Sequence, residues 1–152
     1  MRFFRAFVAL CCCRDVIKYI HREVSNIYIY YNANPRGYVV GDCTVRAISK
    51  ALGKSWEDVY AGLALDGVIL CDLPNADRVW NAYLKRQGFR RKSVDAECDC
   101  YTVAEFAAAH PSGVYVMAIP GHVVCVIDGD WYDTWDSGAE MPVYYWEKER
   151  DS

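Results

Sequence analysis

Cys43 and His122 are the two residues whose types and surroundings best suit covalent chemistry. Cys43 stands in the run Gly-Asp-Cys-Thr-Val-Arg at the predicted start of a helix, and His122 opens a predicted β-hairpin. A helix N-terminus offers unpaired backbone N–H groups and the positive end of the helix dipole, so it favours a thiolate over a thiol. A thiolate nucleophile and a histidine base together can carry out acyl transfer.

A carboxylate behind the histidine would hold its tautomer, and the return strand of the hairpin offers two candidates. Asp133 lies inside the predicted strand, whereas Asp136 lies toward its end. The register of the hairpin decides which of them reaches His122, and the sequence alone does not give that register. Its place within the strand favours Asp133, with Asp136 as the alternative. Trp135, between them, is expected to cover the histidine–carboxylate pair or to pack in the core.

The predicted elements that carry these residues place helices first and strands after them. Val45, Ile48 and Leu52 repeat on one helical face, and Gly53 ends that helix. Three further helices are predicted from capping residues and breakers: one capped by Ser55, one from Asn75 or Asp77 to Gly88, and one from Thr102 to before Pro111. Strands are predicted at 27–31, 89–94, 114–119, 122–127, 131–135 and 143–146. This order indicates an α+β fold with an antiparallel sheet.

Composition narrows the classes of protein and partner. The 152 residues suit a single domain. The formal net charge of -3 gives no electrostatic footprint for nucleic acid, so no nucleic-acid partner is expected. The eight cysteines are unevenly spaced, unlike a disulfide framework, and this favours a reducing cytoplasm. Cys98 and Cys100 could form half of a metal site, but no partner set completes it, so neither a metal nor another cofactor is expected.

Residues 1–29 are expected to form an N-terminal extension to a domain that spans residues 30–152. The apolar stretch 1–13 is interrupted by a charged residue and is too short to span a bilayer, so no membrane partner is expected. Palmitoylation of the cysteines at positions 11–13 would give a membrane-associated alternative. An amphipathic helix is predicted over residues 14–25.

The chain resembles the papain-like cysteine peptidase superfamily in the motifs around its cysteine and histidine. Gly41 to Cys43 opens a helix, and Gly121 to Val124 opens a hairpin later in the chain. In that superfamily a helical half presents the cysteine, and an antiparallel sheet presents the histidine. The third member of its triad lies on the strand after the histidine, in a place that Asp133 to Trp135 occupies here. The resemblance therefore implies a papain-like fold with a triad of Cys43, His122 and Asp133.

A closer resemblance, over about residues 30 to 148, is to small uncharacterised proteins of bacteria and their phages. The segments Tyr31 to Pro35, Gly41 to Ile48 and Asp133 to Ser137 carry it. If the chain is phage-encoded, the cytoplasm in which it is expected would be that of the host.

An oxyanion hole needs hydrogen-bond donors beside the nucleophile. The papain-like pattern places a glutamine shortly before the cysteine, and this chain has Pro35 to Tyr38 there. Asn34 or Asn32 could donate instead, together with the Cys43 backbone N–H, and each such donor is worth about 10²- to 10³-fold in rate. Asn34 could equally start the turn at Pro35.

These residues predict a thiol-dependent hydrolase that acts on an amide or isopeptide bond in a protein or peptide substrate. We expect Asp42 and Trp135 to lie beside the substrate cleft. Peptidases, deamidases and acyl transferases share this machinery, so the triad does not choose among them. The alternative is a catalytically inactive binding module with the same fold, such as a phage protein acting on a host factor. The sequence makes no prediction of oligomeric state.

Overall fold

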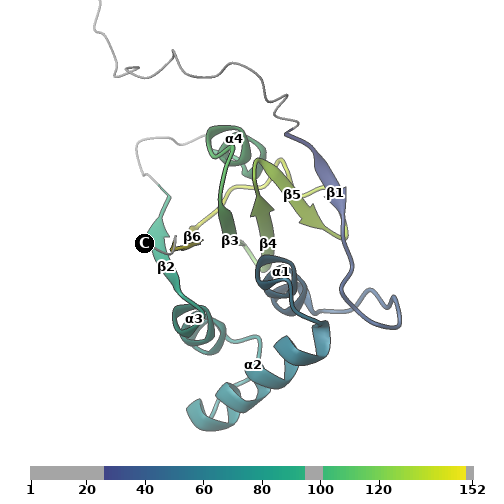
Figure 1. The fold of residues 1–152 in the computed structure, drawn as a ribbon, viewed down its shortest axis with the longest axis vertical. Coiled ribbons are helices and arrows are strands. Elements are labelled where there is room, and N and C mark those ends of the chain that lie inside the picture. The colour runs from purple at the N-terminus through teal and green to yellow at the C-terminus, as the bar shows by residue number, and fades with distance from the viewer. Residues whose placement is uncertain (1–25, 95–100, 150–152) are drawn as a thin grey trace, which may run out of the picture.

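The structure is a computed structural model that describes residues 26–94 and 101–149 (Figure 1). Within these residues it is an α+β fold of four helices and a mixed six-stranded sheet. The helices are α1 (Cys43–Leu52), α2 (Trp56–Leu70), α3 (Asp77–Arg86) and α4 (Val103–Ala109). The strands are β1 (Tyr28–Tyr30), β2 (Phe89–Ser93), β3 (Val114–Ile119), β4 (His122–Ile127), β5 (Asp130–Asp133) and β6 (Tyr144–Lys148).

Capping residues fix the helix ends where the sequence predicted them. Gly53 ends α1 in the left-handed conformation, with φ of 64°, which glycine adopts without steric cost. The Ser55 hydroxyl caps α2 by accepting a hydrogen bond from the Asp58 N–H at 3.1 Å. A reciprocal capping box between Thr102 and Glu105 starts α4.

Two tight turns build the antiparallel part of the sheet. Pro120 and Gly121 join β3 to β4, and Gly121 takes the positive φ of 70° that this turn needs. Asp128 and Gly129, both with positive φ, join β4 to β5. The sheet order is β1-β5-β4-β3-β6-β2.

Strand β1 makes the sheet mixed rather than wholly antiparallel, which corrects the expectation from the sequence. It pairs in parallel with β5, placing Tyr28 beside Trp131 and Tyr30 beside Asp133. Parallel neighbours need a long connection, and the helices and the other strands between β1 and β5 provide it. The core domain therefore includes Tyr28, ahead of the boundary expected after residue 29. The helix predicted over 14–25 and the cysteines at 11–13 lie outside the described residues.

The central strands β3 and β4 of the sheet are buried on both faces. Along β4, Val123 and Cys125 point into the core shared with α1, α2 and α3, while Val124 and Val126 point into the core shared with α4. This alternation is the two-residue period of a strand whose faces are both covered. The first of these cores holds α1 in place against β4.

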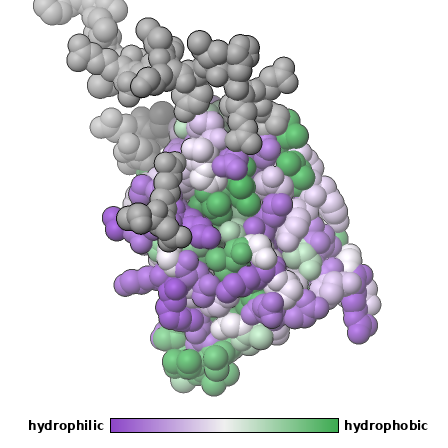
Figure 2. Space-filling view, in the orientation of Figure 1, coloured by the Kyte–Doolittle hydropathy of each residue, from purple (hydrophilic) through white to green (hydrophobic). Residues whose placement is uncertain are grey.

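Helix α2 keeps an apolar side in contact with solvent. Leu65, Val68 and Ile69 are exposed, Val68 by 76% of its surface. Figure 2 shows the resulting apolar patch at the lower end of the molecule, where α2 lies in Figure 1. Among the described helices, none is both long enough and apolar enough to cross a membrane.

Candidate active site

Cys43 and His122 share one cleft of about 380 Å³. The cleft forms where the start of α1, the start of α3 and the turn between β3 and β4 meet the first residue of β6. Its walls are formed by Cys43, Thr44, Asn75, Asp77, Trp80, Ala118, Ile119, Pro120, Gly121, His122, Val123, Val143 and Tyr144. A cysteine at a helix start and a histidine at a strand start thus open into the same space.

The histidine is held by a carboxylate on the neighbouring strand. His122 Nε2 lies 2.6 Å from Asp133 Oδ2. The register pairs Cys125 with Tyr132, so its extension puts Asp133 opposite Val124, two residues along β4 from His122. Of the two carboxylates that the sequence left open, Asp133 is therefore the one in contact with the histidine.

Asp136 is engaged elsewhere. Its Oδ1 accepts hydrogen bonds from Trp131 Nε1 and from the Gly138 N–H, both at 3.0 Å. These bonds fold the loop after β5 back onto Trp131. Asp136 thus has a structural role at this loop.

The Cys43 thiol and the His122 imidazole line the same cleft and shift each other's pKa. Because Asp133 binds Nε2, Nδ1 is the ring nitrogen left to face Cys43. Burial disfavours ionisation of the thiol, but hydrogen bonds and charge from His122, with the Val123 backbone N–H and the Thr44 side chain, outweigh it and lower the pKa of Cys43. Burial likewise disfavours an imidazolium, yet Asp133 and Cys43 raise the pKa of His122 to about 9. Both directions favour a thiolate–imidazolium pair.

Asp133 is fixed on several sides, with only 2% of its surface exposed. Its Oδ1 accepts the Thr134 N–H at 2.7 Å and lies 3.3 Å from Arg46 Nη2. Its backbone carbonyl accepts the Tyr31 N–H from the end of β1 at 2.8 Å. Burial raises the pKa of this carboxyl, but hydrogen bonding and charge from His122, followed by the other donors, bring the pKa below its usual value.

Arg46 is a member of the site that the sequence interpretation missed. It lies one turn after Cys43 on α1 and is only 4% exposed. Its guanidinium joins Asp133 to Asp42, which it contacts through a second nitrogen. A charged side chain among the apolar residues of α1, four residues after Asp42, is the signal that could have revealed this ion pair.

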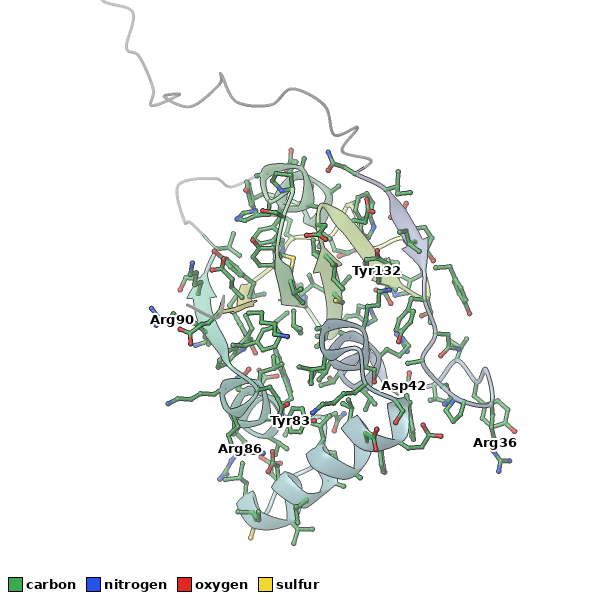
Figure 3. The ribbon with its side chains drawn as sticks, in the orientation of Figure 1. Arg36, Asp42, Tyr83, Arg86, Arg90 and Tyr132 are labelled. Atoms are coloured by element: carbon green, nitrogen blue, oxygen red, sulfur yellow. The ribbon has the colours of Figure 1, made fainter. Side chains whose placement is uncertain are left out.

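Asp42 precedes α1 but does not cap it with its side chain. One carboxylate oxygen binds Arg46 and the other accepts the Trp56 Nε1–H at 2.9 Å. Figure 3 shows Asp42 where the start of α1 meets α2. The residue is thus buried behind Cys43 and does not line the cleft beside which it was expected.

Trp135 and the two asparagines complete the set of predicted residues. The Trp135 ring centroid lies 5.3 Å from that of His122, and the residue stays 43% exposed. Like Asp42, Trp135 does not line the cleft beside which it was expected. Asn32 Nδ2 donates to the Tyr38 carbonyl at 3.1 Å, and Asn34 Oδ1 accepts the Arg36 N–H at 3.0 Å. Both asparagines shape the loop before Cys43, and neither lines the cleft.

Within 26–94 and 101–149, no group of three or more His, Cys, Asp or Glu side chains could hold a metal ion. Cys98 and Cys100 lie outside these ranges.

Comparison with known proteins gives no relative for this chain. No family model, no curated protein and no solved structure matches it.

Proposed function

We propose that this chain is a thiol-dependent hydrolase with a papain-like arrangement, which cleaves an amide or isopeptide bond in a protein or peptide. One observation carries the proposal: the Cys43 thiol and the His122 ring line one cleft and shift each other's pKa, and the ring contacts the buried Asp133 carboxylate. The packing of a helix that presents the cysteine on strands that present the histidine supports the papain-like assignment.

The proposed reaction has two halves. The Cys43 thiolate attacks the carbonyl carbon, and the tetrahedral intermediate collapses by breaking the C–N bond. His122 donates its Nδ1 proton to the departing amine, leaving a thioester on Cys43. A water molecule then loses a proton to His122 and attacks the thioester, which releases the acid and restores the thiolate–imidazolium pair. Asp133 keeps the ring oriented and stabilises its charged form.

The start of α1 would stabilise the oxyanion of the tetrahedral intermediate. The Cys43 backbone N–H belongs to the first turn of the helix, where N–H groups have no partner within the helix. The Asp42 carboxylate is turned toward Trp56 and Arg46, so it does not compete for this region. Developing negative charge there is favoured by both the N–H group and the helix dipole.

The test is alkylation by iodoacetamide at pH 6, followed site by site with peptide mass spectrometry. Cys71 is the internal control because it is exposed, whereas Cys43 is half-buried. An activated thiolate predicts that Cys43 reacts faster than Cys71 in spite of its lower exposure. Faster labelling of Cys71 would contradict the proposal and leave the inactive binding module as the better interpretation.

A further inference from the structure

The charge in the cleft is unevenly distributed. Besides the Cys43–His122 pair, Asp77, at the first position of α3, is the only charged residue among the described residues that line the cleft, and these include no lysine or arginine. The remaining walls are neutral and largely apolar, with Pro120 and Val143 among them. The cleft thus combines a reactive end with a carboxylate and an apolar surface.

Asp77 is held in place but carries no counter-charge within the described residues. Its Oδ1 accepts the Trp80 Nε1–H at 3.1 Å. Asp66, Asp72 and Asp133 each face a basic side chain, whereas no ion pair between described residues involves Asp77.

The negative charge of Asp77 also acts on Tyr144, which lines the same cleft. Burial raises the pKa of Tyr144, and the Asp77 carboxylate raises it further, whereas Asn81 and Arg91 oppose the shift. The Arg91 guanidinium lies over the Tyr144 ring, 4.0 Å from its centroid, but Arg91 does not line the cleft. The positive charge of Arg91 partly offsets the effect of Asp77 on Tyr144.

We propose that Asp77 selects substrates with a cationic group, an alkylammonium or a guanidinium, near the bond that is cleaved. A flexible apolar stem that ends in a cation fits these walls, because the stem can lie along Pro120 and Val143 while the head group pairs with Asp77. Lysine and arginine side chains have this chemistry. The inference rests on the proposed function, since it concerns the substrate of the same cleft.

The test uses three methanethiosulfonate reagents that differ in charge: aminoethyl (cationic), methyl (neutral) and sulfonatoethyl (anionic). The Cys43 thiolate attacks the sulfenyl sulfur, a disulfide forms, and methanesulfinate leaves. Second-order rates at Cys43 are measured by peptide mapping at low salt. The cation-to-anion rate ratio at Cys43 is expected to exceed the ratio at exposed Cys71 and to shrink at high salt.

Three variants test whether Asp77 causes the cation-to-anion rate ratio at Cys43. Asp77→Asn keeps an acceptor for Trp80 and should lower the ratio by about fivefold, the size expected for an exposed charge acting on both reagents in a water-like dielectric. Asp77→Glu should largely preserve the ratio. Asp72→Asn, at a carboxylate outside the cleft, should leave it unchanged.

Two negative outcomes are distinguishable. If Asp77→Asn leaves the ratio unchanged while Cys43 still reacts rapidly with the neutral reagent, the inference about the substrate is wrong and the hydrolase proposal stands. If Cys43 reacts no faster than Cys71 with the neutral reagent, the hydrolase proposal fails, and the substrate inference fails with it.

Discussion

Cys43 and Cys125 lie in the same contact between α1 and β4, yet their environments favour opposite chemistry. Cys125 sits in the middle of β4, fully buried, and burial raises its pKa far above the ordinary thiol value. Cys43 sits at the end of the contact, where hydrogen bonds and charge outweigh burial and lower its pKa. Burial alone would make both thiols inert.

The difference comes from the ends of the two elements. At the start of α1 the first backbone N–H groups have no partner within the helix, and at the start of β4, beside a turn, His122 interacts with the Cys43 thiol. Residues in the middle of a helix or strand have their backbone groups paired and meet only side chains. A reactive thiol in this fold therefore depends on position along the element more than on which elements pack together.

The substitution His122→Ala should reduce the reactivity of Cys43 more than any of the substitutions that follow. The change removes the main group that lowers the pKa of Cys43. We expect the alkylation rate of Cys43 at pH 6 to fall by at least about a hundredfold, because the thiolate fraction falls to that of an ordinary thiol. The readout is the pH profile of iodoacetamide labelling, with the Cys71 profile as reference. An unchanged profile at Cys43 would show that the histidine does not activate it.

Replacing Arg46 by methionine should destabilise the fold most among single changes near the site. It leaves Asp42 and Asp133 buried without their shared cation. The expected loss in free energy of unfolding is about 3 to 5 kcal/mol, measured by urea denaturation. The control is Arg90→Met in the exposed Arg90–Glu149 pair, where about 0 to 1 kcal/mol is expected. Equal losses in the two variants would contradict the assigned network.

The pKa of His122 shows how much Asp133 contributes to stabilising the imidazolium. In the intact chain, NMR should give His122 a pKa of about 9, and Asp133→Asn should lower it. The pKa is higher in the folded chain than the unfolded value of 6.5. The pair therefore stabilises the fold fully below about pH 6.5, and this stabilisation is lost as the pH rises through about 9. A pKa near 6.5 in the intact chain would contradict the ion pair.

Cys125→Ala should have the smallest effect. It removes one buried sulfur from an apolar core and should cost about 1 kcal/mol in free energy of unfolding. Labelling of Cys43 by iodoacetamide should be unchanged, because the cavity lies in the middle of β4. A slower reaction at Cys43 would show that packing at Cys125 helps to position the site.

Local chemistry explains which parts of the fold were predictable. The caps at Ser55 and Thr102 and the turn at Pro120 and Gly121 act over a few residues, so the sequence predicted the elements that they bound. The pairing of Asp133 with His122 depended on the register of the hairpin. Because the sequence did not give that register, Asp136 remained an alternative partner of His122. The sequence favoured Asp133 from its position, and the structure was needed to decide between the two carboxylates.

Contacts between distant segments could not be predicted in the same way. Arg46 and Asp133 are 87 residues apart, and nothing near either residue specifies the other. The parallel pairing of β1 with β5 is equally remote in sequence, because it is fixed only when the sheet assembles. Asn32 and Asn34 were considered as oxyanion donors, but the structure shows them in hydrogen bonds within their own loop.

Strand β1 also has a protective consequence. It covers the outer edge of β5, whose backbone would otherwise offer open N–H and C=O groups to another chain. A shortened chain that begins after Tyr31 would expose this edge beside Asp133. Such a fragment would tend to add strands from its own copies, so self-association would accompany the loss of a well-placed carboxylate.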